Sequence, residues 1–172
     1  MRLFISINFE GKVKNEIQDV INEMKNYSIQ GKFVNIDHMH LTLEFLGEIP
    51  PEKVHKIKEV IDEVHFEPFT MNLTKVGCFK RREGNIYWLG IEHNEMLIKI
   101  QSKLHELLIK QGFELEDRPY KAHVTVGRKI RLQDDADVQR LSNSINNISI
   151  NVDKIDLMKS EHINGKLVYS II

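Results

Sequence analysis

One short pattern occurs twice in this chain, as His40-Leu41-Thr42-Leu43 and as His123-Val124-Thr125-Val126. Each copy lies in a segment of alternating apolar residues, which predicts a β-strand. Because successive side chains of a strand point to opposite faces, each histidine shares a face with its threonine. We expect Leu41, Leu43 and Phe45 to point into a core. The polar face needs a cleft, water or a ligand, so the pattern predicts a site.

The composition limits the domain organisation and the kinds of partner. With 172 residues, of which 41% are hydrophobic and 28% charged, we expect a single bilobal domain spanning residues 1–172. The net charge is −1, so any polyanion must be bound by local clusters of cations. Two candidates are Lys80-Arg81-Arg82 and Arg128-Lys129-x-Arg131, although each alone is typical of a solvated loop.

The cysteine content and the first residues indicate a compartment. Cys78 is the single cysteine, which excludes an internal disulfide and a multi-cysteine metal site and fits a reducing compartment. The N-terminal apolar run is interrupted by Ser6 and Asn8 and has no small-residue cleavage site, so it predicts a strand and not a signal peptide. No run reaches membrane-spanning length. We expect a cytoplasmic monomer with no membrane partner.

Periodicity predicts an internal repeat. We expect helices at 13–24, 54–64, 97–108 and about 134–144, strands at 3–9, 32–36, 39–46, 69–79, 86–92, 148–158 and 167–171, and a strand around the second histidine. The strands 32–36 and 39–46 are predicted to pair, and the strands 69–79 and 86–92 are predicted to form a hairpin around the charged turn Arg81–Asn85. Asn164-Gly165 is predicted to form a further hairpin turn. Ile5 lies 35 residues before His40, and Leu89 lies 34 residues before His123. Such nearly equal spacing predicts two related lobes that share one cleft.

Two imidazoles and two hydroxyls suit reactions at a phosphodiester. Such a reaction needs a base to deprotonate the attacking oxygen and an acid to protonate the leaving oxygen. A histidine can serve in either role, because its ordinary pKa is about 6.5. Threonine hydroxyls and a cation would hold the non-bridging oxygens. Arg128, five residues after His123 and predicted just beyond the strand end, is a candidate cation; no metal or other cofactor is required.

These residues carry a resemblance to a known family. The chain resembles the two-histidine (2H) phosphoesterases, and among them the RNA 2′,3′-cyclic phosphodiesterases once described as 2′-5′ RNA ligases. The resemblance rests on four stretches that follow the family's order: Met1–Ile7, His40–Gly47, Tyr87–Gly90 and Asp117–Arg128. The chain departs from the family's pattern at Ala122, where a proline often stands, and at Asn8, where an aspartate is common.

The resemblance implies a fold, a reaction and roles. The fold would be a bilobal, duplicated α+β structure in which two antiparallel sheets line a central cleft, with helices on the outer faces. His40 would be the proton donor to the leaving oxygen, and His123 the proton acceptor that activates water. Thr42, Thr125 and Arg128 would bind the substrate. The expected activity is metal-independent opening of a 2′,3′-cyclic phosphate at an RNA end to a 2′-phosphomonoester, with weak 2′-5′ ligation in reverse.

Other interpretations stay open at this stage. The substrate could be a small cyclic nucleotide, or the motifs could grip RNA ends without turning them over. A metallohydrolase is less favoured: His38 and His40 have a metal-ligand spacing, but no carboxylate or thiol cluster completes the set. Either histidine alone could be a satisfied core residue. For base stacking the sequence offers four aromatic candidates, of which we expect one near the cleft: Phe4, Tyr87, Trp88 and Tyr120.

Overall fold

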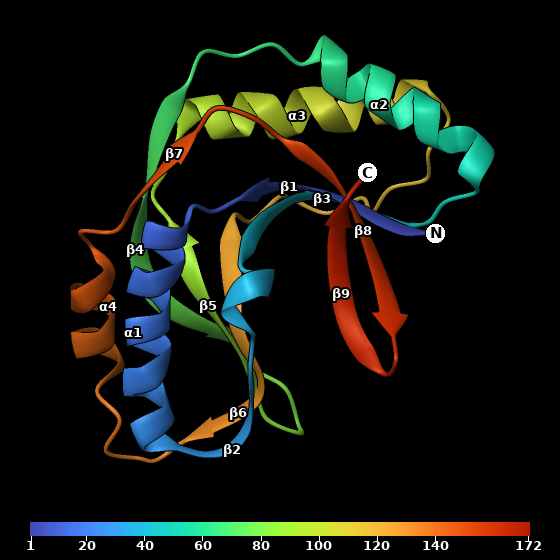
Figure 1. Ribbon diagram of the computed structural model, residues 1–172. Coiled ribbons are helices and arrows are strands. Elements are labelled where there is room, and N and C mark those ends of the chain that lie inside the picture. The colour runs from blue at the N-terminus through green and yellow to red at the C-terminus, as the bar shows by residue number, and fades with distance from the viewer.

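Two antiparallel β-sheets form the frame of the molecule, and the computed structural model describes residues 1–172 (Figure 1). The strands are β1 (Arg2–Asn8), β2 (Ser28–Phe33), β3 (His40–Glu48), β4 (Phe69–Phe79), β5 (Asn85–Ile91), β6 (His123–Leu132), β7 (Ser149–Val152), β8 (Asp156–Ile163) and β9 (Lys166–Ile171). The four-stranded sheet has the order β3-β1-β8-β9, and the five-stranded sheet has the order β2-β6-β5-β4-β7. The predicted α+β fold with two antiparallel sheets is confirmed.

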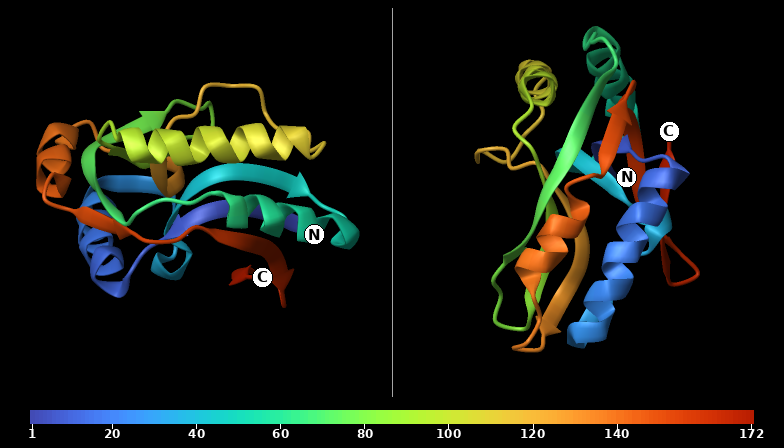
Figure 2. Two further views of the ribbon diagram at one scale, coloured as in Figure 1. Left: turned by 90° about the horizontal axis from the view of Figure 1, so that it is seen from above. Right: turned by 90° about the vertical axis from the view of Figure 1, so that its left-hand side faces the viewer.

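The helices interlock the two halves of the chain. They are α1 (Gly11–Tyr27), α2 (Val54–Glu63), α3 (Glu95–Lys110) and α4 (Val138–Ile145), with short 3₁₀ turns at Ile36–His38 and Pro51–Lys53. Helix α1 follows a strand of the four-stranded sheet but contacts β6 and α4, whereas α3 follows a strand of the five-stranded sheet but contacts β3 and α2. Figure 2 shows α1 beside α4 and α2 beside α3 at opposite ends. No helix is both long and apolar enough to cross a membrane.

The predicted repeat is visible in the strand pairing. In the first half β1 pairs with β3, and Asn8 lies opposite His40. In the second half β5 pairs with β6, and Gly90 lies opposite His123. The two strands that carry the histidines also contact each other, β3 against β6. The duplication therefore brings both motifs to the boundary between the lobes.

One hydrophobic core runs through both lobes. The predicted apolar stripe of α1 is buried, as is that of α3. These side chains belong to one continuous cluster of 37 buried residues, which also includes Leu41 of β3 and Val124 of β6. Burying an aliphatic side chain contributes roughly 1.5–3 kcal/mol, so this shared core holds the two lobes together.

The predicted pairing of strands 32–36 and 39–46 is wrong. β2 pairs with β6, and β3 pairs with β1, in different sheets. The 3₁₀ turn at Ile36–His38 lies between them and carries the chain from one sheet to the other. Alternation of apolar residues identifies a strand but does not name its partner, because partners are chosen by packing over long separations.

The predicted strand 148–158 is also divided. It forms β7, which pairs with β4, and β8, which pairs with β1 in the other sheet. The fourth helix begins later than predicted, at Val138, because the Asp137 side chain caps it by accepting from the backbone N–H of Arg140. The Asn164-Gly165 turn is confirmed, and both residues have positive φ, 51° and 76°.

Phe45 does not point into the core as predicted. Its side chain is 42% exposed, while Glu44 is only 8% exposed. The cause is a bulge in β3: Ser6 pairs with Thr42 but the preceding residue, Ile5, pairs with Glu44. One extra residue reverses the faces of the strand beyond it, because side chains alternate with a period of two.

Candidate active site

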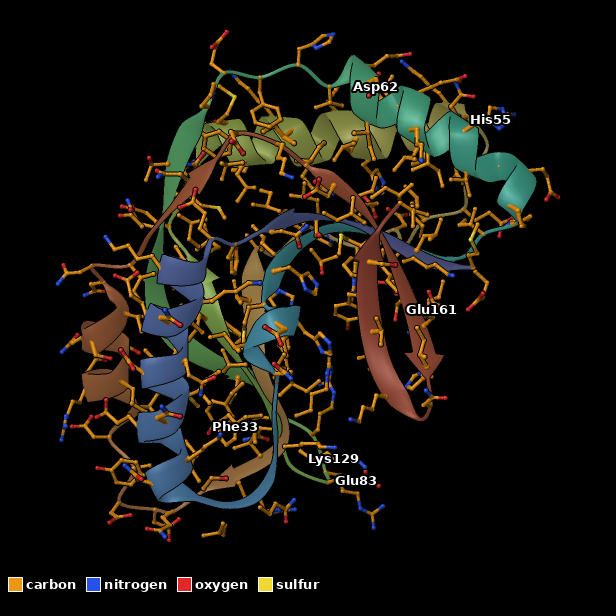
Figure 3. The ribbon with its side chains drawn as sticks, in the orientation of Figure 1. Phe33, His55, Asp62, Glu83, Lys129 and Glu161 are labelled. Atoms are coloured by element: carbon orange, nitrogen blue, oxygen red, sulfur yellow. The ribbon has the colours of Figure 1, made fainter.

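A cleft of about 1270 Å³ separates the two lobes, and the predicted site residues meet in it. Its lining includes His40, Thr42, His123, Thr125 and Arg128. In Figure 3, Phe33 and Lys129 mark one wall of this cleft, on the five-stranded sheet, and Glu161 marks the β8–β9 hairpin that forms the other. The tertiary structure thus joins two motifs that lie far apart in the sequence.

His40 is held by hydrogen bonds at both ring nitrogens. Its Nδ1 lies 2.7 Å from the carbonyl oxygen of His38, and its Nε2 lies 3.1 Å from Thr42 Oγ1. A carbonyl only accepts, so Nδ1 carries a hydrogen and donates it. Phe4 and Tyr169 pack on the ring, with centroids 4.9 and 5.5 Å away. The orientation of this imidazole is fixed, with Nε2 on the threonine side.

His123 repeats the arrangement at one nitrogen only. Its Nδ1 donates to the carbonyl oxygen of Lys121 at 2.7 Å, again two residues earlier, and Nε2 bonds to no protein group. Phe79 packs edge-on against the ring, with centroids 5.3 Å apart. The ammonium of Lys121 lies 4.4 Å from the centre of the Trp88 ring, a cation–π contact beside the imidazole. His123 therefore has a free Nε2 and a nearby positive charge.

Tyr120 connects the two motifs through the backbone. It precedes His123 by three residues, and its hydroxyl donates to the main-chain carbonyl of Thr42 at 2.9 Å. Burial raises the pKa of the Tyr120 phenol, so the hydroxyl stays protonated and remains a donor. This bond ties the segment before β6 to β3 at the threonine that contacts His40.

Arg128 lies inside β6 and not beyond its end, which corrects the prediction. β6 continues to Leu132 because β2 pairs with it there, and Lys32 of β2 lies opposite Arg128. Both side chains are exposed at the cleft. Two cations thus stand side by side on this wall of the cleft.

The two histidines differ in their electrostatic surroundings. Burial lowers the pKa of His40, and the only charge that adds to this effect is that of His38. Burial also lowers the pKa of His123, but three cations, Lys121, Arg118 and Arg128, lower it further. Both imidazoles are therefore biased toward the neutral form, and His123 is biased by more positive charges.

Sequence reasoning found one cleft aromatic and missed another. Phe4, one of the four candidates, lines the cleft, and Trp88 lies beside His123 with its Nε1 buried and unpartnered. Tyr87 is buried and Tyr120 bonds to the backbone, so neither is free for stacking. Tyr169 of β9 lines the cleft and was not predicted. Its position depends on pairing through β8 to β1, for which the sequence holds no local signal.

The structure has no cluster of metal-binding side chains around His38, as a metallohydrolase would need. No three or more histidine, cysteine, aspartate or glutamate side chains are grouped so that they could hold a metal ion. The His38 ring packs on Tyr169 instead, with centroids 4.7 Å apart. His38 thus belongs to the aromatic wall of the cleft.

Comparison with known proteins gives consistent matches. The sequence matches the profile of the family described as LigT like phosphoesterase twice, over residues 8–88 and 89–169. It is 33% identical over 129 residues to an RNA 2′,3′-cyclic phosphodiesterase of Archaeoglobus fulgidus, covering 74% of this chain and 72% of that protein. It is 28% identical over 167 residues to a protein of the same name from Methanothermobacter thermautotrophicus, covering 94% of this chain and 90% of that protein.

Solved structures share the fold. Escherichia coli LigT complexed with 3′-AMP superposes with a TM-score of 0.82 at 24% identity, covering 99% of this chain and 94% of that one. The Thermus thermophilus protein TT0787 gives a TM-score of 0.78 at 22% identity, covering 100% of this chain and 95% of that one. The two profile matches also divide the chain at Trp88, inside β5, in agreement with the duplicated strand pairs.

Proposed function

Because this chain belongs to the LigT-like phosphoesterase family, we propose that it opens 2′,3′-cyclic phosphates at RNA ends to 2′-phosphomonoesters. The observation that carries the proposal is the matched pair of histidines. Each has Nδ1 bound to the carbonyl two residues earlier, and each lines the same cleft. One acid and one base are what hydrolysis of a phosphodiester requires. Curated relatives named RNA 2′,3′-cyclic phosphodiesterase support the choice of substrate.

The proposed reaction uses the Nε2 atoms. His123 Nε2 takes a proton from water as the water oxygen bonds to phosphorus. The bond between phosphorus and the ribose O3′ breaks, and protonated His40 gives its Nε2 proton to that oxygen. The phosphate stays on O2′, and one water has been added. For the next turnover His123 releases its proton and His40 regains one. If the 5′-hydroxyl of a second RNA takes the place of water, the same base removes its proton, O5′ bonds to phosphorus, and the bond from phosphorus to O3′ breaks with a proton from the same acid. This forms a 2′-5′ phosphodiester, which is the weak ligation we propose; in the cleavage of that bond the acid and base exchange roles.

The charges around each imidazole support this division of roles. A base must be neutral, and three nearby cations disfavour protonation of His123. His40 has only His38 beside it, so the negative charge of a bound phosphate raises its pKa with less opposition. When His40 is protonated, Nδ1 keeps its bond to the His38 carbonyl and Nε2 carries the proton to be donated.

Thr42, Thr125 and Arg128 are proposed to bind the phosphate. The two hydroxyls share strand faces with the histidines, and all three side chains line the cleft. Hydrogen bonds to the non-bridging oxygens stabilise the charge that develops in the five-coordinate transition state. A guanidinium can hold two oxygens at once, which fixes the orientation of the phosphate.

We also propose that residues 1–172 act as a single domain, as a monomer in the cytoplasm. The interlocked helices and the shared core support one domain. The single cysteine, Cys78, fits a reducing compartment.

The test uses the purified protein in excess chelator. An RNA oligomer ending in a 2′,3′-cyclic phosphate and 2′,3′-cyclic AMP are supplied separately, and products are separated against 2′- and 3′-phosphate standards. We expect a 2′-phosphate from the oligomer, formed about 10²–10⁴-fold less efficiently by His40→Ala or His123→Ala. Turnover of 2′,3′-cyclic AMP but not of the oligomer would favour an enzyme that acts on small cyclic nucleotides. Binding of the oligomer without product would favour an RNA-end binding protein, and a requirement for added metal would contradict the two-histidine mechanism.

A further inference from the structure

Two basic segments that are far apart in the sequence meet beside the cleft. One is Lys80-Arg81-Arg82 in the β4–β5 turn, and the other is Arg128-Lys129-Ile130-Arg131 on β6. The guanidinium of Arg131 donates to the carbonyl oxygen of Arg82 at 2.9 Å. We call the side chains of Lys80, Arg81, Arg82 and Arg131 the basic edge. The clusters, each typical of a solvated loop when taken alone, form one surface in the folded chain.

The turn is fixed on β6. Gly84 has a φ of +117°, and a Cβ there would lie 2.6 Å from the carbonyl oxygen of Lys129, so only glycine permits this close approach. The side-chain amide of Gln30 on β2 donates to the carbonyls of Glu83, at 2.8 Å, and Lys129, at 3.1 Å. The basic edge is therefore held at a constant position relative to the cleft.

The basic edge continues the cationic wall of the cleft. Lys32, Arg128 and Lys129 line the cleft, and every side chain of the basic edge is exposed. Glu83, the acidic residue of the turn, pairs with Lys129 at 3.1 Å. Figure 3 shows both of these residues lower in the view than the β8–β9 hairpin. In a chain of net charge −1, this local excess of positive charge is a polyanion-binding feature.

We infer that the basic edge binds phosphates on the 5′ side of the reacting end, so that single-stranded RNA oligomers are preferred over cyclic mononucleotides. This inference rests on the proposed function. A 2′,3′-cyclic phosphate lies on the last nucleotide, so the rest of the strand must leave the cleft. The part of β6 from Thr125 to Arg131 is about 20 Å long, at ~3.3 Å per residue. This length is enough for several nucleotides to lie along it.

The chemistry of the edge favours the RNA backbone over its bases. The edge consists of lysine and arginine side chains alone, and guanidinium groups match the geometry of phosphate oxygens. Contacts to phosphate position a strand without identifying its sequence. We therefore expect the preference for oligomers to depend on length and salt concentration but not on the identity of the upstream bases.

The test compares kcat/KM for an RNA of about six nucleotides with kcat/KM for 2′,3′-cyclic AMP. In Arg81→Gln/Arg82→Gln the ratio of the two values is expected to fall at least about five-fold, mainly through KM of the oligomer. In Lys53→Gln/Lys58→Gln, which loses the same charge near and within α2 at the opposite end of the molecule, the ratio stays unchanged (Figure 1). Arg81→Lys/Arg82→Lys is expected to restore most of the ratio.

Binding of the same oligomer, with a 2′-phosphate end, is measured by fluorescence anisotropy at several salt concentrations. The slope of log K against log salt is expected to be shallower by about 0.7 for each lost phosphate contact, so by about 1.4 in the double variant. An unchanged ratio together with an unchanged salt slope overturns the inference, as does a wild-type ratio near one. If the wild type turns over neither substrate, the proposed function fails, and the salt slope alone decides on the basic edge.

Discussion

His40 and His123 occupy the same position in two copies of one motif, yet their neighbours differ. In both, Nδ1 donates to the carbonyl two residues earlier at 2.7 Å. His40 then contacts a threonine hydroxyl and two aromatic rings, whereas His123 lies near three cations and has a free Nε2. The duplicated backbone therefore gives both imidazoles one orientation. The surrounding side chains, which are not duplicated, give each a different tendency to hold a proton.

The strongest test of this difference replaces each histidine and changes the leaving atom. His40→Ala and His123→Ala should each reduce kcat/KM for the cyclic-ended oligomer by about 10²–10⁴-fold. In a 3′-thio cyclic substrate the 3′-sulfur leaves as a thiolate and needs no acid. This substrate should therefore restore most of the rate of His40→Ala but not that of His123→Ala. The rates are measured by quantifying the product.

His55→Ala is the matched control, because His55 lies on α2 away from the cleft (Figure 3). It should behave as the wild type on both substrates. Equal restoration of both active-site variants by sulfur would mean that the two histidines share one role.

Loss of the Thr42 hydroxyl should reduce kcat/KM more than loss of the Thr125 hydroxyl. Thr42→Val keeps the side-chain shape but removes the hydroxyl that lies 3.1 Å from His40 Nε2, so kcat/KM should fall about 10–100-fold. Thr125→Val removes a hydroxyl that does not bond to His123, and we expect a loss of about ten-fold or less, mostly in KM. Steady-state kinetics separates the two. Thr42→Ser and Thr125→Ser, which keep the hydroxyl, should retain most of the wild-type kcat/KM. Identical losses of kcat/KM in the two valine variants would contradict the proposed difference between the two threonines.

Lys121 provides a test of the charges around His123. Burial and nearby cations lower the pKa of His123, so the limb of kcat/KM that rises with pH should lie below pH 6.5, where the base loses its proton. Lys121→Met removes one of those cations. The pKa of His123 should rise, and the limb should move to higher pH by about half a unit.

The pH profile is measured at constant ionic strength. Lys58→Met, at an exposed position of α2, should leave the limb in place. A shift to lower pH in Lys121→Met would show that its ammonium does not oppose protonation of His123.

The smallest expected effect concerns the bond that joins the two motifs. Tyr120→Phe removes the hydroxyl that donates to the Thr42 carbonyl and leaves that carbonyl without this donor. We expect the free energy of unfolding to fall by about 1 kcal/mol and kcat/KM to fall within about three-fold. Urea unfolding and kinetics measure the two. Tyr27→Phe is the control, and a stability equal to that of the wild type would indicate that the Tyr120 bond contributes nothing net.

Much of the local structure was predictable because it depends on short-range patterns. The stripes of α1 and α3, the hairpin of β4 and β5, and the Asn164-Gly165 turn follow from spacing and turn chemistry. The face of Phe45 was not predictable, because a bulge in β3 is decided by pairing with β1. The place of Tyr169 in the cleft was not predictable either, because it depends on contacts with strands far away in the sequence.

The sequence by itself determined the residues that meet in the cleft: a strand with period two places each histidine beside its threonine, and the repeat supplies two such strands. The tertiary structure alone decided how the two copies differ. The aromatic wall of His40, the cations around His123 and the docking of the β4–β5 turn on β6 all come from segments distant in the chain. The reason is physical: orientation follows from local backbone geometry, whereas burial and electrostatic environment depend on everything that packs nearby.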